Sequence, residues 1–495
     1  MAEPPTPWLH LLRPVYRLVL RWAYIAALTL FAFHRSLESL FQTTRAGSLN
    51  GYVWVVPIAG IMAAIGVARR ERTELPIHDR QTDVIVGVIG LGVALMVHGV
   101  LLQRYAGYFH LLRLDLVAMW LFVSSASVVL FGLRPVIRFA WVWALLLAVF
   151  PLPYQVTVIL FGGSRFAAGG GVLIIAAVAT AIAVGRTWSR AVMGAVLSWA
   201  VGLVVLLAMA VWTPDAPVFI FQIVPAVTSI ALVGMTLYLY ARRGAPKRVL
   251  DRKLEPLAAK EVWSGLPLVL AVAIALSPVR LPGPTGPPPT WVSQTTFGGP
   301  LVAPVGWHVT AETEYNWVRR LYGRHATLLR QRMTADTGSP KWDKFGRPRT
   351  VIVDSTNTFQ PFSLDVYPST LLYDTASSRL SDPRPVDLGR GVKGYLFSVI
   401  DDQLLVTWNL LVFHWRNATS AQRVLIGAVD NHEADAPFPE PNGALFPTLG
   451  TMFTVLFRGN AVTTNREPEF KDADMLTQFG RGLVTAQLRD AEPLS

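Results

Sequence analysis

Long apolar runs separated by short, mostly basic loops occupy the first 280 residues of the chain. Charged residues nearly vanish from several runs of about 20 residues, the length that a helix needs to cross a hydrocarbon core of roughly 30 Å. The pattern predicts about nine membrane-spanning helices, at 19–34, 52–68, 84–103, 115–133, 137–153, 166–185, 191–212, 218–241 and 263–279. Residues 1–280 are therefore expected to form a multi-pass α-helical membrane domain, with the lipid bilayer as its surroundings.

The density of Lys and Arg alternates from one loop to the next, and this alternation predicts the orientation. Loops on the cytoplasmic side of a membrane carry the excess of basic residues. With the N terminus inside, the inner segments hold 18 Lys and Arg and the outer loops hold five. We therefore expect a protein of the cell membrane with a cytoplasmic N terminus and, after nine crossings, an extracytoplasmic C-terminal region.

Composition agrees with a membrane protein, since 52% of the residues are hydrophobic and only 15% are charged. The net charge of +12 belongs to the membrane half, because residues 301–495 contain 20 Lys and Arg against 21 Asp and Glu. Basic loops beside anionic lipid account for this charge, and no basic face with recognition motifs is present. We therefore expect no nucleic-acid partner.

The second half of the chain reads as a separate α+β domain. A Pro-rich linker at 281–300 cannot continue a helix, and 301–495 has an ordinary soluble composition. Apolar spacing predicts an amphipathic helix within 311–333, and a last helix is expected at 470–488. Strands are predicted at 350–354, 393–400, 403–415 and 422–429, with a hairpin at Asp401 and Asp402. The expected sheet is mostly antiparallel.

The polar residues of this domain form no recognisable chemical set. Asp354 and Asp430 are expected at strand ends, where turn formation explains them. The four histidines, His308, His325, His414 and His432, are scattered without metal-ligand spacing, and the chain has no cysteine. We expect no metal and no cofactor, and thiol chemistry is excluded.

The sequence FPLP at 150–153 follows one apolar run, and Gly169, Gly170 and Gly171 open the next. Proline inside a lipid-facing helix leaves carbonyl groups without partners, whereas a helix end tolerates it. We therefore expect FPLP to end a helix. The glycines are expected to let the following helix pack closely against its neighbours.

Two segments resemble a known family. These are NGYVWVVPIAGIMAAIGVARR at 50–70 and RPVIRFAWVWALLLAVFPLP at 134–153, with a basic inner loop between them. Together they resemble the exosortase/archaeosortase family of multi-pass membrane transpeptidases, over roughly residues 15–240. Some members of that family carry an outer, exosortase-associated domain of about 200 residues after the last span, and the layout of this chain is similar.

The chain departs from the family at its chemistry. The resemblance implies a membrane-embedded Cys nucleophile with Arg and His partners, but this sequence has no Cys and no His between His110 and His308. No catalytic residue can therefore be carried over. The resemblance then favours a non-catalytic, exosortase-like protein that handles exported proteins or surface polysaccharide at the cell envelope, with the exported proteins or the polysaccharide machinery as partners.

Two alternatives remain open. A serine-based peptidase or transpeptidase would use Ser164, beside Arg165, with His98, His110 or Asp115 as the base on the outer side. The competing interpretation makes these residues anchors at the membrane interface. A transporter or lipid-linked sugar transferase is the second alternative, although the chain shows no halves of matching hydropathy and no paired acidic motif on an early outer loop.

Overall fold

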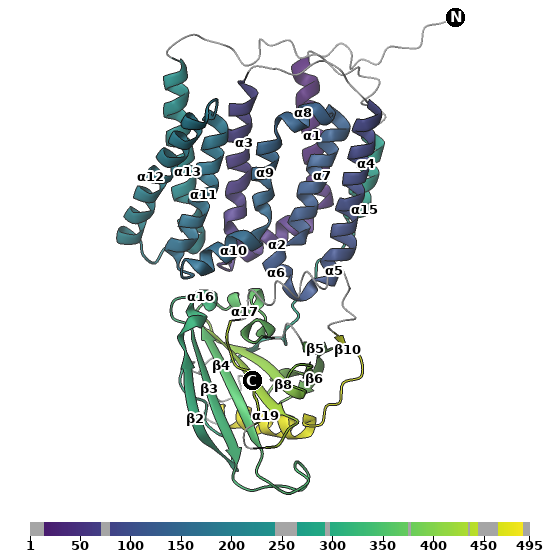
Figure 1. Cartoon of the computed structure of the whole chain (residues 1–495), viewed down its shortest axis with the longest axis vertical. Helices are drawn as coiled ribbons and strands as arrows, with labels where there is room; N and C mark the ends of the chain where they lie inside the picture. The colour runs from purple at the N-terminus through teal and green to yellow at the C-terminus, as the bar shows by residue number, and fades with distance from the viewer. Residues whose placement is uncertain are drawn as a thin grey trace, which may run out of the picture. The chain divides into compact units, whose positions relative to one another are not determined.

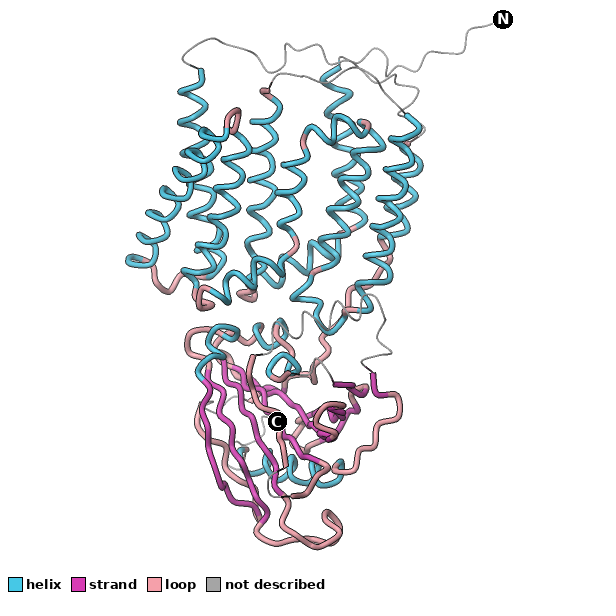
Figure 2. The backbone as a smooth tube through the Cα atoms, in the orientation of Figure 1, coloured by secondary structure: helices cyan, strands magenta, loops and turns pink. Residues whose placement is uncertain are grey.

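A computed structural model describes residues 14–70, 80–242, 265–292, 298–374, 378–433, 436–443 and 464–488 (Figure 1). The chain divides into two compact units, Met1–Pro282 and Gly283–Ser495. Figure 2 shows helices throughout the first unit, and the strands of the described residues lie in the second. This division agrees with a helical domain followed by a sheet-rich domain.

The first unit is a bundle of helices that run side by side (Figure 1). Its elements are α1 (Pro14–Ala32), α2 (His34–Arg45), η2 (Leu49–Trp54), α3 (Val55–Ala68), α4 (Arg80–Met96), η3 (Val97–Leu101), α5 (Leu102–Arg104), η4 (Ala106–Tyr108), α6 (Phe109–Leu112), α7 (Leu114–Phe131), α8 (Leu133–Arg138), α9 (Ala140–Leu146), η5 (Leu147–Val149), α10 (Pro151–Leu160), α11 (Arg165–Val184), α12 (Trp188–Trp212), α13 (Val218–Arg242) and α15 (Leu266–Leu276). Among the described residues, six helices are long and apolar enough to cross a membrane, or eight if each of two bent pairs is one span.

The ninth expected span falls on α15. Its described part has 11 residues, which is about 17 Å and less than a hydrocarbon core needs. The two bent pairs are α1 with α2, at 72°, and the α9 segment with α10, at 67°. The remaining expected spans correspond to α3, α4, α7, α11, α12 and α13.

The outer surface of the bundle is apolar, as lipid contact requires. Only 22% of the most apolar stretch of α12 is buried inside the bundle. Large side chains such as Val204, Val211 and Trp212 are 66%, 75% and 80% exposed. Soluble proteins rarely expose apolar patches of this extent. The described helices therefore support a membrane-embedded protein.

Helix α15 runs parallel to α1. The hydroxyl of Tyr24 donates to the carbonyl of Leu266 at 2.8 Å, and Arg35 donates to the carbonyl of Pro278 at 3.1 Å. Tyr24, in the middle of α1, thus meets the start of α15, and Arg35, just after the end of α1, meets the segment just after the end of α15. The chain consequently leaves the bundle at the end where α1 stops and α2 begins.

The opposite end of the bundle carries the basic residues that were expected inside. Arg80 donates to the carbonyl of Val129 at 2.7 Å, and Arg138 donates to the carbonyl of Arg70 at 2.7 Å, so these arginines satisfy carbonyl groups at the ends of α7 and α3. Of the expected inner basic residues, Arg13, Arg72, Arg243, Lys247, Arg248, Arg252, Lys253 and Lys260 lie outside the described residues.

The second unit contains a ten-stranded sheet in the order β10-β5-β7-β8-β9-β4-β3-β2, with β1 beside β8 and β6 beside β7. Its elements are β1 (Thr290–Trp291), β2 (Trp307–Tyr315), η6 (Asn316–Val318), α16 (Arg319–Tyr322), β3 (Thr327–Ala335), β4 (Thr350–Thr358), α17 (Ser363–Val366), η7 (Ser369–Leu372), β5 (Ser378–Ser381), β6 (Arg384–Asp387), β7 (Lys393–Asp401), β8 (Val406–Arg416), β9 (Ala421–Val429), β10 (Thr464–Asn465) and α19 (Ala473–Gln487). Among the described strands, only β1 with β8 and β10 with β5 pair in parallel. The mostly antiparallel sheet is therefore confirmed.

One face of this sheet packs on α19. Met475, Leu476 and Phe479 on the helix share a buried apolar core with Leu411 and Ile426 on the central strands. The predicted last helix and the four predicted strands are confirmed, as is the hairpin at Asp401 and Asp402 between β7 and β8.

The prediction of an amphipathic helix within 311–333 is wrong. That segment forms β2, the one-turn helix α16 and β3. Gly323 has a φ of +102°, which stops α16 and turns the chain back. The following apolar residues then pair with β2 on one side and β4 on the other, so sheet pairing decides their conformation.

The prediction that Asp354 lies at a strand end is also wrong, because the residue lies inside β4 and not at a turn. Its carboxylate is fully buried and accepts two hydrogen bonds from Arg330, at 2.8 and 2.7 Å. The hydroxyl of Tyr373 donates to the same carboxylate at 2.6 Å. The carboxylate of Asp354 thus neutralises the buried guanidinium of Arg330 on the neighbouring strand β3.

Candidate functional site: a buried polar core in the helical unit

The sequence FPLP joins two helices. Phe150 is extended, with φ −72° and ψ 111°, and Pro151 is in the first turn of α10. A residue before proline disfavours the helical conformation, whereas proline at the first helical position costs nothing, because its missing N–H would have no partner there. FPLP therefore ends one helix, as expected, and also starts a second helix that is bent by 67°.

The bend turns two polar side chains of α10 into the bundle, and one of them is Gln155. Its amide donates to Asn50 Oδ1 at 2.7 Å and to the carbonyl of His110 at 3.4 Å. The amide of Asn50 donates to the same carbonyl at 3.0 Å. Asn50 and Gln155 are completely buried. Three short elements, η2, α6 and α10, are thereby tied together through amides.

The second inward side chain of α10 is Tyr154. Its hydroxyl donates to the carbonyl of Ala168 at 2.9 Å and accepts from the amide of Gln222 at 2.8 Å. The amide of Gln222 also donates to the carbonyl of Leu49 at 2.7 Å. The ring of Tyr52 stacks on Tyr154, with 3.9 Å between centroids. These contacts extend the polar core to α11 and α13.

An ion pair lies where α6 passes into α7. Arg113 donates through Nε and one terminal nitrogen to Asp115, at 3.0 and 2.9 Å, and both side chains are completely buried. Arg113 adopts a left-handed conformation, with φ +43°, and also donates to the carbonyl of Ser36 at 3.0 Å. Two-point contact and mutual neutralisation are what allow two charges to remain buried.

The structure gives Ser164 a structural role. Its hydroxyl accepts from the N–H of Ala167 at 3.0 Å and so caps the start of α11. Arg165 donates to the carbonyl of Pro214 at 2.9 Å. Within the described residues, no hydrogen bond joins Ser164 to His98 or His110.

The three candidate bases have other surroundings. His98 is buried in the bundle, where its ring packs edge-on against Phe33 with 5.0 Å between centroids. His110 contributes its backbone carbonyl to the amide cluster, and burial together with the positive charge of Arg113 lowers the pKa of its imidazole to about 4. Asp115 is held by Arg113. None of the three is placed as the base of a serine nucleophile in the described part of the chain.

Several buried polar atoms of the core have no hydrogen-bond partner among the described residues. They are Gln155 Oε1, Gln222 Oε1, Ser36 Oγ, His98 Nδ1 and one terminal nitrogen of Arg113. Such groups need a water molecule or a polar ligand inside an apolar bundle. The described residues contain no group of three His, Asp or Glu side chains that could hold a metal ion. The core thus consists of hydrogen-bonded amides, a tyrosine hydroxyl and backbone carbonyl groups.

The sequence patterns did not point to Asn50, Arg113, Tyr154, Gln155 or Gln222 as site residues. One signal was available, because Gln155 and Gln222 are amides inside otherwise apolar runs. Polar residues within a span face the bundle interior and mark candidate functional positions.

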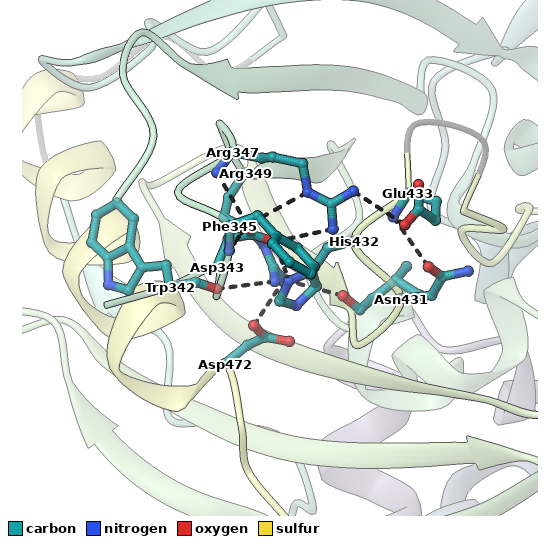
Figure 3. A network of polar contacts seen from close by, with 10 residues as sticks. Trp342, Asp343, Phe345, Arg347, Arg349, Asn431, His432, Glu433 and Asp472 are labelled. Atoms are coloured by element: carbon teal, nitrogen blue, oxygen red, sulfur yellow. Dashed lines mark hydrogen bonds and ion pairs between the residues drawn. The ribbon is translucent and has the colours of Figure 1, made fainter. Parts of the chain in front are cut away.

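A second polar cluster ties loops together in the sheet unit (Figure 3). Asp343 accepts from the N–H groups of Phe345 and Arg347, at 2.8 and 3.1 Å, and from His432 Nδ1 at 2.8 Å. The guanidinium of Arg347 donates to a carboxylate oxygen of Glu433 at 3.1 Å. The Arg347 backbone N–H, assisted by His432, holds the pKa of Asp343 well below its usual range. No serine in the described residues hydrogen-bonds to His432, so the cluster reads as a structural clasp.

The comparisons with known proteins add no identity to this geometry. The search found no match to the chain among protein-family models, curated proteins or solved structures.

Proposed function

We propose that this is an exosortase-like integral membrane protein of the cell envelope without catalytic activity. Its C-terminal unit lies outside the cell membrane and contacts the partner, in exported-protein sorting or in surface polysaccharide assembly. The sorting or polysaccharide role rests on the resemblance of residues 50–70 and 134–153 to the exosortase family. The membrane setting rests on the long apolar helices.

The path of α15 supports the extracytoplasmic position. The carbonyl groups of Pro278 and Arg280 accept from Arg35 and Gln103, so the chain leaves the bundle where α1 and α4 end. Arg70, Arg80 and Arg138 gather at the other end, which the positive-inside rule assigns to the cytoplasm. Residues 283–495 then begin on the outer side.

The cap formed by Ser164 is the observation that carries the non-catalytic proposal. A serine nucleophile needs a base within hydrogen-bond reach, whereas the hydroxyl of Ser164 accepts from Ala167. The groups at the centre of the bundle are the amides of Asn50, Gln155 and Gln222. Amides do not titrate near neutral pH, so they can bind and position a partner but cannot transfer its protons.

The test compares exported proteins in the native cells by mass spectrometry of their C termini. The samples are the wild type, a strain without the protein, and the Ser164→Ala and His98→Ala variants. We expect every exported C-terminal tail to be the same in all four, while the strain without the protein shows an envelope defect that both variants repair. A tail that is removed in the wild type and retained in Ser164→Ala would establish serine-based cleavage and overturn the proposal.

A truncation locates the function within the chain. Removing residues 290–495 should reproduce the envelope defect although the membrane unit is still present, because the partner contacts are proposed to lie in the second unit. Immunodetection in the membrane fraction controls for loss of the truncated protein. Full repair by the truncated chain would place the function in the bundle instead.

A further inference from the structure

One end of the sheet gathers residues from five strands. Tyr315 pairs with Leu328, Thr327 with Asn357, Asn357 with Gln422, and Gln422 with Trp415. The end of β2, the start of β3, the end of β4, the start of β9 and the end of β8 therefore lie in one row. The helices α16 and α17 lie at the same end of these strands (Figure 1).

The chain also enters the second unit at this end. Strand β1 pairs with the last residues of β8, with Thr290 opposite Trp415 and Trp291 opposite Arg416. Helix α15 ends at Leu276, so 13 residues separate it from β1. A fully extended segment of that length reaches about 40 Å. The connection to an apolar helix of the bundle thus starts from this end of the sheet.

Three arginines lie exposed on the connection between β2 and β3. They are Arg319, Arg320 and Arg324. Arg319 has one weak ion pair, at 4.0 Å from Glu314, and its side chain is 50% exposed. Arg320 and Arg324 make no ion pair with any described residue. This end of the sheet therefore offers guanidinium groups whose hydrogen-bond donors face solvent.

Exposed aromatic rings lie at the same end. Trp291 is 55% exposed, and the guanidinium of Arg416 lies 5.5 Å from its ring centre. Phe359, which directly follows β4, is also 55% exposed and meets the ring of His325 edge-on at 6.3 Å. Aromatic rings beside arginines are the combination that settles at a membrane interface, where rings occupy the headgroup level and guanidinium groups bind phosphates.

We propose that this end of the sheet, formed by Trp291, Arg319, Arg320, Arg324, His325, Phe359 and Arg416, binds the surface of an anionic phospholipid bilayer. The arginines contact lipid phosphates and the two exposed rings enter the headgroup region. The short connection from α15 keeps the surface within reach of the bilayer, so a weak attraction is sufficient. The inference rests on membrane residence and is independent of the sorting or polysaccharide role.

Acidic groups near this surface limit the attraction. Glu314 and Asp365 are exposed close to the arginines, on β2 and α17. Binding should therefore need anionic lipid and should weaken as salt screens the arginines. The loss of each arginine should weaken binding roughly fivefold.

The absence of cysteine makes a direct test possible in the full-length chain. Ala418→Cys places a fluorophore at the turn after β8, at the proposed surface, and Gln403→Cys places one at the turn before β8, at the opposite end; both positions are exposed. Each labelled protein is reconstituted in nanodiscs of phosphatidylcholine, with or without phosphatidylglycerol. Quenching by a doxyl-labelled phospholipid is then measured. Nanodiscs present the same lipid on both sides, so the result does not depend on orientation in the cell.

We expect strong quenching at residue 418 and weak quenching at residue 403, with the difference appearing only when phosphatidylglycerol is present. The triple variant Arg319→Gln, Arg320→Gln, Arg324→Gln should lose most of the quenching at residue 418. The matched control Lys344→Gln, Arg384→Gln, Arg466→Gln removes the same charge from exposed positions elsewhere and should retain it. Equal quenching at both labels, stronger quenching at residue 403, or no effect of phosphatidylglycerol would overturn the proposal.

Discussion

Gln155 illustrates how one side chain links three parts of the bundle. Its amide donates to Asn50 on η2 and to the carbonyl of His110 on α6, and the side chains of Asn50 and Gln155 are completely buried. A hydrogen bond across helices in a membrane contributes about 0.6 kcal/mol on average and up to about 1.7 kcal/mol. Gln155 is therefore expected to contribute on this scale to the stability of the bundle.

Replacing Gln155 by Leu should lower the stability of the bundle by about 1–2 kcal/mol, because Asn50 loses its amide partner in an apolar interior. Thermal unfolding in detergent measures this effect. The control is Thr157→Val, since the exposed hydroxyl of Thr157 bonds only the carbonyl of Pro153 in its own helix. Equal melting temperatures for the Gln155→Leu protein and the wild type would show that the amide cluster carries no structural load.

Asp343 makes a second prediction, which concerns pH. Its pKa is depressed in the folded protein, chiefly by the backbone N–H of Arg347. A depressed pKa contributes stability above the unfolded value, near pH 4, and that contribution is lost as the pH falls toward the folded value. Asp343→Asn should therefore melt at a lower temperature than the wild type at neutral pH, and the gap should narrow below about pH 4.

The control for this prediction is Asp474→Asn, because Asp474 is 83% exposed and has only a distant ion pair with Lys341. Hydrogen–deuterium exchange of peptides from the second unit follows its melting, because tryptophan residues lie in both units and their fluorescence would not separate them. A difference in melting temperature between Asp343→Asn and the wild type that stays constant from neutral to acid pH would contradict the depressed pKa of Asp343.

At the scale of elements, the three glycines near the start of α11 differ in how closely their neighbours pack against them. A methyl group on Gly169 would lie 2.5 Å from Leu206 Cδ1 and 2.8 Å from the carbonyl of Phe221, and one on Gly171 would lie 2.9 Å from the ring of Tyr154. A methyl group on Gly170 would meet nothing within 4 Å. The expected close packing is thus confirmed for two of the three glycines.

These neighbours form a matched pair of substitutions. Gly169→Ala should destabilise the bundle by about 1–3 kcal/mol, because α11 must move away from α12 and α13. Gly170→Ala should be neutral or stabilising by up to about 1 kcal/mol, since alanine favours the helix and nothing obstructs it. The two melting temperatures in detergent provide the comparison. Equal destabilisation by both changes would show that the helices do not pack as described.

The elements also show what the sequence could and could not predict. Spans such as 191–212 followed from apolar length alone, because hydrocarbon thickness fixes that length. Strands β7, β8 and β9 followed from β-branched and aromatic runs between turn residues. The prediction for 311–333 failed because the apolar spacing around Trp317 and Leu321 fits a helix, but only one helical turn forms there. Strand pairing with β3 and β4 fixes the residues on either side of that turn.

The candidate site was the hardest part to predict. The polar core forms because FPLP bends the chain and brings α10 against η2 and α6, and no local pattern states that long-range contact. Ser164 was singled out for its chemistry, yet its position before Ala167 makes it a helix cap. Hydroxyl groups at the start of a helix take that role commonly.

At the scale of the whole molecule, the proposed function and the lipid-binding surface both depend on the membrane. The function further requires that residues 283–495 lie outside the cell. Helix α15 leads to the end of the bundle that the proposal assigns to the outer side, and its described length of 11 residues is less than a full span. The orientation is therefore the claim on which the envelope role stands.

The most direct measurement of that claim uses single cysteines in a chain that otherwise has none. Gln403→Cys lies in the second unit, and Ser189→Cys lies at the start of α12, at the end proposed to face the cytoplasm; both positions are exposed. A membrane-impermeant maleimide should label Gln403→Cys in intact spheroplasts and should label Ser189→Cys only after lysis. Labelling of Ser189→Cys in intact spheroplasts, with Gln403→Cys protected until lysis, would place the second unit in the cytoplasm and contradict the account.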